Sequence, residues 1–319
     1  MARLARFAAF AALWLVAATA GATPRFEVVV AVAADDTATP LWQAMLAARI
    51  GADAAQRHAA EARPVSASEQ AWVDLIRRQA GLLPAEWASL EAPFAPAQAP
   101  EAIRIVIGNR GGEDAFVHDA RTIGFDAARL QAEYGPADDP ENVARALRFL
   151  RHESTHLLQR AWLAQRPPWP DDPWSRTLLH LWKEGHGNLH SLSDRWWIVD
   201  ADANPAGRYS DLAEDTLAQL VPTLVGRLGA LACADPRHVP NLEQGLSMGP
   251  FARKWGAVPM ALWLKRAQSR HPQALRDFVQ AGPAGVPAFI RAQLDEAQRP
   301  WFDAVVDNAT RCAAGAAER

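Results

Sequence analysis

Residues 139–164 read DPENVARALRFLRHESTHLLQRAWLA, and this stretch decides the fold of the chain. A Pro at the first helical position, directly after an Asp that can cap the helix, is a typical helix start. Apolar residues then recur at helical spacing until Pro167 and the residues around it end the pattern. The stretch therefore predicts one long helix that ends near Ala164.

The chain that follows this helix has helical character almost throughout. A second helix is predicted at about 174–192 and a third from near Ser210. Further helical patterns lie at about 257–270, 273–280, 286–293 and 296–310. We therefore expect a C-terminal helical lobe over residues 201–319.

The chain before the long helix mixes strands with helices. Apolar and β-branched runs at 25–34, 103–107 and 122–125 predict three strands. Ser66-x-x-Glu69 is a capping box that predicts the start of a helix. The expected fold class is α+β, mainly helical, with a small N-terminal β-sheet lobe over residues 23–135 and the two central helices over 136–200.

Composition and charge narrow the class of protein. Of the 319 residues, 50% are hydrophobic and 22% are charged, which is typical of a globular protein. The formal net charge is -3, so the chain lacks the basic surface that nucleic acid requires. We therefore expect no nucleic-acid partner.

The first 22 residues have the pattern of an export signal peptide. Arg3 and Arg6 precede an apolar run at 7–20, and small residues follow where a signal peptidase would cleave. The apolar run is too short for a comfortable membrane span. We expect cleavage, no membrane association afterwards, and a periplasmic or secreted protein.

The two cysteines, Cys233 and Cys312, fit that location. An even pair of cysteines in an oxidising compartment favours a disulfide, although two buried free thiols are the alternative. A Cys233–Cys312 bridge would join the last helix to the rest of the C-terminal lobe.

The long helix contains a His-Glu-x-x-His sequence at residues 152–156. Residues four apart share one face of a helix, so His152 and His156 can bind one zinc ion together. Glu153 follows the first His directly, and its carboxylate can reach a water on the metal rather than the metal. Zinc lowers the pKa of such a water towards about 7, and Glu153 can then act as the general base. A catalytic zinc site needs one more protein ligand.

The next predicted helix carries Lys183-Glu184-Gly185-His186-Gly187-Asn188. With these two motifs, over about residues 100–190, the chain resembles the gluzincin group of zinc peptidases, the broad thermolysin- and aminopeptidase-like clan. In that group a Glu on the helix after His-Glu-x-x-His completes the zinc site. The resemblance implies that Glu184 is the third metal ligand. Gly185 and Gly187 would let the two helices approach closely.

Other residues of this helix stay open as the third ligand, namely His180, His186 and His190. The metzincin class is excluded, because its third His would fall at Trp162. Thermolysin-like enzymes have an Asp one turn past the ligand Glu that orients a ligand His, and Asn188 occupies that position. The resemblance implies the same role for Asn188, with a contact to a helix N–H or to solvent as the alternative.

A hydrolase of this group also needs a donor to the oxyanion that forms during the reaction. In gluzincins the donor is commonly a Tyr or a His. The resemblance implies Tyr209, one of only two Tyr in the chain, with His186 and His190 as other possibilities and a structural role as the alternative. The substrate backbone would bind along strand 103–107 or strand 122–125.

Six of the 13 Trp residues fall between Trp162 and Trp197. Residues of this type can stack on a substrate in a cleft, but they more often pack between helices. We expect packing.

These observations predict an exported zinc-dependent peptidase, a gluzincin-like hydrolase that acts on a peptide or protein. Its expected metal ligands are His152, His156 and Glu184, and its expected catalytic residues are Glu153 and Tyr209. Two other functions stay open: an inactive binding protein that keeps the zinc helices as a scaffold, and a zinc hydrolase of a non-peptide cell-envelope substrate.

Overall fold

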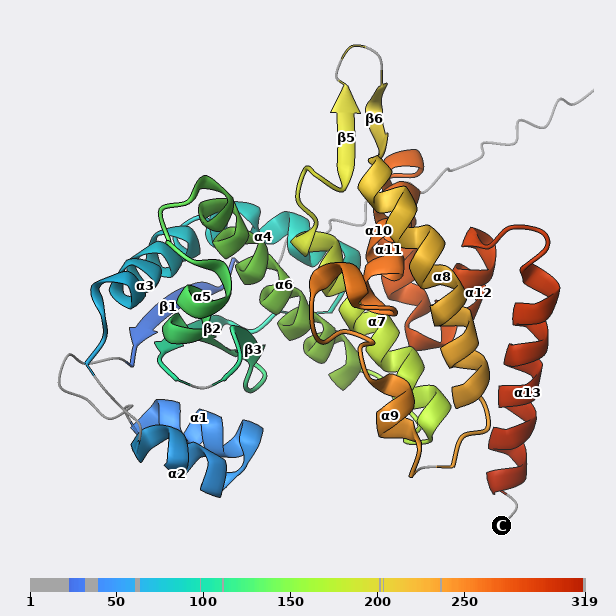
Figure 1. The fold of residues 1–319 in the computed structure, drawn as a ribbon, viewed down its shortest axis with the longest axis horizontal. Helices are drawn as coiled ribbons and strands as arrows, with labels where there is room; N and C mark the ends of the chain where they lie inside the picture. Colours follow the sequence, from blue (N-terminus) through green and yellow to red (C-terminus); the bar gives the residue numbers. More distant parts are fainter. Residues whose placement is uncertain are drawn as a thin grey trace, which may run out of the picture.

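The structure is a computed structural model that describes residues 23–31, 40–60, 64–97, 99–110, 112–200, 202, 204–235 and 237–317. The predicted export signal lies outside these residues. The described chain is mostly helical and has a small mixed sheet near its N-terminal end (Figure 1). The predicted α+β, mainly helical, fold class is confirmed.

The N-terminal lobe is built on the small sheet. Its elements are β1 (Arg25–Val30), α1 (Pro40–Ile50), α2 (Ala52–Ala60), α3 (Ala67–Ala80), α4 (Leu83–Glu91), η1 (Ala92–Phe94), β2 (Ala102–Gly108), β3 (Ala115–Val117), β4 (Thr122–Asp126) and α5 (Ala127–Tyr134). The predicted capping box begins α3: the Ser66 side chain accepts from Glu69 N, and the Glu69 carboxylate accepts from Ser66 N. The three predicted strands correspond to β1, β2 and β4.

The sheet has the order β1-β2-β4-β3, with β1, β2 and β4 parallel and β3 antiparallel at the edge. Side chains of β2 alternate between two buried faces: Ile105 and Ile107 enter the main core, whereas Val106 packs in a second core with Trp42. In Figure 1, α3 and α6 lie over one face and α1 lies over the other. Burial on both faces explains why β2 is almost continuously apolar.

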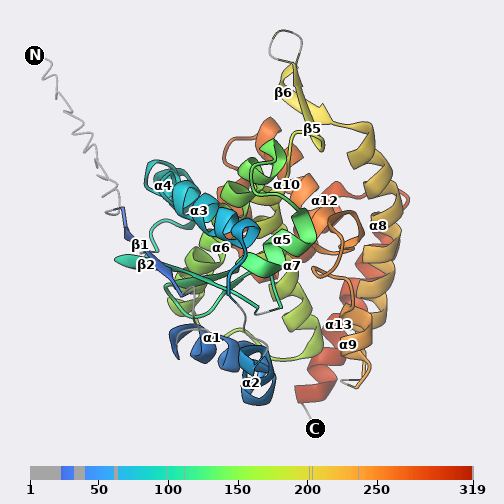
Figure 2. The same ribbon diagram turned by 60° about the vertical axis from the view of Figure 1, so that its left-hand side comes forward.

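Two helices occupy the centre of the molecule, α6 (Pro140–Ala164) and α7 (Pro173–Ser191). Each begins with an Asp cap and a Pro, because Asp139 accepts from Glu141 N and Asp172 accepts from Ser175 N. α6 packs against α3, α4 and the sheet, while α7 packs against α10 of the other lobe. The α6–α7 contact therefore joins the two lobes (Figure 2).

The C-terminal lobe is helical except for one hairpin. Its elements are β5 (Trp197–Asp200), β6 (Asn204–Tyr209), α8 (Asp211–Leu231), α9 (Val239–Glu243), η2 (Phe251–Arg253), α10 (Ala257–Arg270), α11 (Ala274–Ala281), η3 (Pro283–Gly285), α12 (Val286–Gln293) and α13 (Arg299–Ala317). The helices predicted at 257–270 and 286–293 have the observed bounds. Cys233 and Cys312 form the predicted disulfide, with Cα atoms 5.6 Å apart, and it joins the end of α8 to α13.

The β5–β6 hairpin was not predicted from the sequence. It stands out from the body of the lobe (Figure 1). Gly207 in β6 has φ +74°, and a Cβ there would come within 2.1 Å of Trp197 Nε1. The hairpin thus needs a glycine where the indole of Trp197 crosses the opposite strand.

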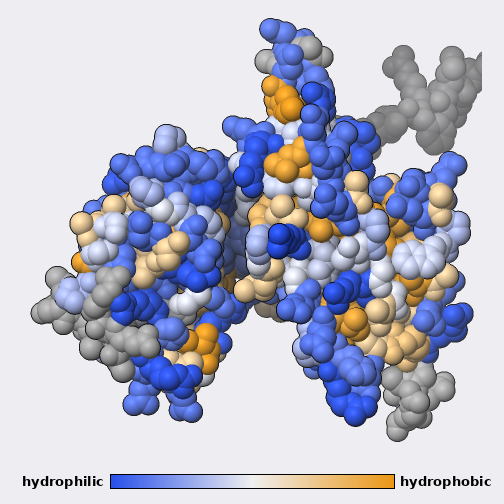
Figure 3. Space-filling model, viewed as in Figure 1, coloured by the Kyte–Doolittle hydropathy of each residue, from blue (hydrophilic) through white to orange (hydrophobic). Residues whose placement is uncertain are grey.

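Figure 3 shows a furrow between the sheet lobe and the C-terminal lobe, over the region where α6 and α7 meet in Figure 1. The side chains of His152 and Glu184, which come from α6 and α7, keep relative exposures of 13% and 19%. Among the described residues, no helix is both long enough and apolar enough to cross a membrane.

Candidate metal centre

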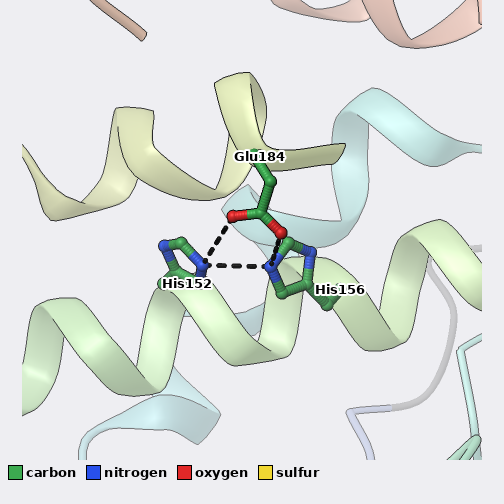
Figure 4. A group of neighbouring side chains, drawn as sticks. All are labelled: His152, His156 and Glu184. Carbon is green, nitrogen blue, oxygen red and sulfur yellow. Dashed lines mark hydrogen bonds and ion pairs between the residues drawn. The ribbon is translucent and has the colours of Figure 1, made fainter. Parts of the chain in front are cut away.

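α6 places the two imidazoles of the His-Glu-x-x-His sequence side by side. His152 and His156 are one helical turn apart, and their Nε2 atoms are 3.0 Å apart. Both rings point away from the axis of α6 towards α7 (Figure 4). The spacing in the sequence thus gives a pair of ring nitrogens that face one point.

α7 supplies the carboxylate that closes the group. Oε1 of Glu184 is 3.4 Å from His156 Nε2, and Oε2 is 3.8 Å from His152 Nε2 (Figure 4). One ligand atom from each of the three residues lies within 4.8 Å of the other two, and no other group of three such residues does so in the described part of the chain. His152, His156 and Glu184 can therefore hold a metal ion.

The spacing of the three ligand atoms fits a small ion. Bonds of about 2 Å to three corners of a tetrahedron would separate these atoms by about 3.3 Å. The two imidazole nitrogens are 3.0 Å apart, and each lies 3.4 or 3.8 Å from a different oxygen of Glu184. These distances are close to the expected separation.

Two glycines of α7 make the close approach possible. A Cβ at Gly187 would lie 3.0 Å from Cε1 of both His152 and His156, and a Cβ at Gly185 would lie 2.5 Å from Met260 Cβ in α10. Gly187 therefore leaves room for the imidazoles, and Gly185 lets α7 contact α10. The expected role is confirmed for Gly187 alone, because Gly185 faces α10 of the C-terminal lobe rather than α6.

The second nitrogen of each imidazole also has a partner. His156 Nδ1 is 2.7 Å from Gln159 Oε1, and the amide of Gln159 is oriented by donation from its Nε2 to the Lys183 carbonyl oxygen. His152 Nδ1 is 3.0 Å from Ser191 Oγ. A proton on Nδ1 of His156 leaves the lone pair of its Nε2 free for a metal, as in most histidine ligands.

Burial keeps these imidazoles neutral. It lowers the pKa of His152 to about 3 and also lowers the pKa of His156. Burial alone would raise the pKa of Glu184, but the imidazoles and Lys183 around it lower that pKa to about 2. At pH 7 the group thus offers two nitrogen lone pairs and one carboxylate, which is the protonation state that a metal needs.

Glu153 lies beside the group but is not part of it. Its side chain is buried, and burial raises its pKa well above 4.5, with the charge of Glu184 acting in the same direction. Glu153 directly follows His152 on α6, so it lies near the ligand atoms but on a different face of the helix. The structure therefore has a carboxyl group of raised pKa next to a possible metal site.

Lys254, which no motif marks, contributes a positive charge from the other lobe. It follows η2, and Asp114, Glu184 and Glu153 all act on its ammonium group. Burial lowers the pKa of Lys254, and these three carboxylates raise it. Its charge therefore interacts with those of Glu153 and Glu184 near the metal group.

The alternatives for the third ligand have other environments. His180 Nε2 is 2.9 Å from Ser247 Oγ. His186 is fully buried, stacks on Phe94 at 5.3 Å, and neither of its ring nitrogens has a hydrogen-bond partner in the described structure. His190 packs beside it at 5.5 Å. None of the three histidines belongs to the metal group.

Two expected roles need correction. Asn188 Nδ2 donates to the carbonyl oxygen of Glu184 at 2.8 Å and reaches its Oε2 at 3.4 Å, so Asn188 orients the carboxylate rather than an imidazole.

The hydroxyl of Tyr209 donates to the Leu262 carbonyl oxygen at 2.9 Å inside the core. Since a phenol has one proton, this arrangement leaves Tyr209 none for an oxyanion.

The Trp residues between 162 and 197 pack as expected. Trp182 is fully buried and lies 5.1 Å from Trp162, and Trp196 contacts Phe251 at 5.3 Å. Trp174 and Trp197 are also buried. The cluster therefore holds α6, α7 and the hairpin together, which removes the main support for a stacking site.

Comparisons of the chain with protein-family models, with curated proteins and with solved structures found no match.

Proposed function

We propose that the protein is a zinc peptidase that hydrolyses peptide bonds with an activated water. The observation that carries the proposal is the meeting of His152, His156 and Glu184, with Glu153 directly beside them. Three ligands and a neighbouring carboxyl group are the parts that a catalytic zinc site of this kind requires.

The donor set favours zinc over other ions. Two imidazole nitrogens and one carboxylate suit Zn²⁺, whereas Mg²⁺ and Ca²⁺ prefer oxygen ligands alone. Three protein ligands also leave a fourth position free. A zinc ion held by His152, His156 and Glu184 would supply a Lewis acid that lowers the pKa of water and polarises a carbonyl group.

Glu153 performs the proton transfers in this proposal. It accepts a proton from the attacking water and then donates that proton to the leaving amine. A raised pKa suits the first step, because a carboxylate of higher pKa is a stronger base towards the attacking water, and the carboxylic acid that forms can then protonate the leaving amine. The buried position of Glu153 is the source of that raised pKa.

We propose Lys254 in place of Tyr209 as the stabiliser of the oxyanion. The charges of Glu153 and Glu184 both act on its ammonium group, so its positive charge is available near the proposed metal site. The substrate would enter through the furrow between the lobes (Figure 3). We propose an exported enzyme, periplasmic or secreted, and the Cys233–Cys312 disulfide supports an oxidising compartment.

Metal content and hydrolysis of a peptide library, measured on the same preparation, test this function. The expected result is about one zinc per chain and cleavage that stops with a chelator and returns with zinc. The Glu153→Gln variant should keep its zinc and lose cleavage by a factor of about 10² or more. A zinc-loaded protein that cleaves no peptide, or a Glu153→Gln variant of normal activity, would contradict the proposal.

A further inference from the structure

A pocket separate from the metal centre opens between α10, α11 and α12. It has a volume of about 530 Å³, within the range of small-molecule sites. α10 lies beside α7, with Met260 against Gly185. Arg266 in the pocket wall is six residues, and so about 9 Å, farther along α10 than Met260. The pocket therefore lies beyond the part of α10 that supports the metal ligands.

Small side chains create this space. Five alanines and one glycine line the pocket, namely Ala267, Ala274, Ala281, Ala288, Ala292 and Gly285. Phe278 and Phe289 pack edge to face at 4.9 Å and form an aromatic wall. Methyl groups and ring faces offer no hydrogen bond, so this part of the pocket suits an apolar chain.

One part of the pocket is basic. Arg266 Nη2 donates to the neutral amide of Gln293 at 2.9 Å, and both residues line the pocket. Arg270 and His271 lie in the same wall. Neither Arg266 nor Arg270 forms an ion pair with a carboxylate of the described chain. Asp277 is the one acidic residue of the lining. The two guanidinium groups thus outnumber the carboxylate and can donate hydrogen bonds to an anionic ligand.

From this combination we infer that the pocket binds an alkyl carboxylate, a molecule with an apolar chain and one terminal carboxylate. The chain lies on the alanines and the Phe278–Phe289 pair, and the carboxylate accepts hydrogen bonds from Arg266 and Arg270. An uncharged alcohol of the same chain length would lose the charge-assisted hydrogen bonds. A cationic amphiphile would meet the two arginines and be repelled.

Calorimetric titration of the full, zinc-loaded chain tests the inference with decanoate, decanol and decyltrimethylammonium below their micelle concentrations. Decanoate should bind with one molecule per chain, decanol at least about tenfold more weakly, and the ammonium compound not at all. Arg270→Gln should weaken decanoate binding about tenfold, whereas Arg276→Gln, on α11 but outside the pocket, should leave it unchanged.

A second pair of variants separates the pocket from other sites. Ala288→Leu fills the pocket and should abolish decanoate binding, while Ala284→Leu lies outside the lining and should not. Equal binding of decanoate and decanol would overturn the charged part of the inference. Decanoate binding that survives Ala288→Leu, or no decanoate binding by the wild-type chain, would overturn the site itself.

Discussion

A Cβ atom at Gly187 would lie 3.0 Å from both Cε1 and Nε2 of His152. Few real Cβ atoms come so close to another atom, and the imidazole cannot retreat freely because Ser191 holds its Nδ1 at 3.0 Å. Gly187 is therefore the point at which the backbone of α7 limits the position of the His152 imidazole on α6.

Replacement of Gly187 by Ala should weaken zinc binding at least about tenfold, because the imidazole must shift out of line with Glu184. Gly226→Ala in α8 is the matched control, since a Cβ there meets no atom within 4 Å. Alanine is the better helix former, so the control should raise the free energy of unfolding by about 0.5–1 kcal/mol with unchanged zinc affinity. Competition with a chromophoric chelator measures the affinity, and equal affinities of both variants would contradict this account of Gly187.

Gln159 should act on zinc affinity without touching the metal. Gln159→Met keeps the volume of the side chain but removes the oxygen that accepts from His156 Nδ1, so zinc affinity should fall by about 10- to 100-fold. Thr177→Val is the control. Thr177 lies elsewhere on α7, and the change removes its partly buried hydrogen bond to Glu243 of α9. It should lower the melting temperature and leave the zinc affinity unchanged; a loss of affinity in the control as large as in Gln159→Met would favour a general loosening of α7.

The helices α6 and α7 and the pairing of the two imidazoles could be predicted because the information is local. Asp caps, prolines and helical periodicity determine the start of α6 and of α7, and a spacing of four residues puts His152 and His156 on one face. Glu184 required more, namely the resemblance to gluzincins, since spacing alone does not distinguish it from His180 four residues earlier.

The rest of the site depends on which distant segments meet. Lys254, whose ammonium interacts with the charges of Glu153 and Glu184, lies after η2, 70 residues past Glu184, and the sequence around it predicts no role for it. Tyr209 was assigned to the oxyanion by analogy, but its proton goes to Leu262, 53 residues away along the chain. β3 is three residues long and is too short for an alternating pattern to appear. The sequence of β6 contains Gly207, which is more typical of a turn than of a strand.

His190 should make stability depend on pH. Burial lowers its pKa from 6.5 to about 4, so between these values the unfolded chain binds a proton that the folded chain does not. The free energy of unfolding should therefore decrease as pH falls from 6.5 to 4, by about 3 kcal/mol in total from this residue. In urea unfolding with chelator present, His190→Phe should lessen this decrease, whereas His238→Gln on the surface should not; parallel pH profiles for His190→Phe and the wild type would show that His190 does not titrate in this range.

Removal of the Cys233–Cys312 disulfide should affect stability but not the metal centre. The bridge spans 79 residues, and its loss is expected to lower the free energy of unfolding by about 2–5 kcal/mol. A Cys233→Ser, Cys312→Ser double variant, compared with the wild type by urea unfolding and chelator competition, should show that loss with unchanged zinc affinity. The bridge joins α8 to α13, outside the α6–α7 contact, so a large change in zinc affinity would mean that the C-terminal helices position Glu184.

Lys254 is predicted to act on the reaction rather than on metal binding. Lys254→Met keeps most of the apolar side chain and removes the charge that interacts with Glu153 and Glu184, so kcat for a cleaved peptide should fall by about 10²-fold. Lys265→Met removes a lysine of the same lobe whose ammonium lies 5.9 Å from the Trp197 ring, and its kcat should be unchanged. Zinc content, measured for both variants, should equal that of the wild type. If Lys254→Met loses zinc in proportion to its activity, the lysine supports the fold of the site, and if its kcat is normal, another group must stabilise the oxyanion.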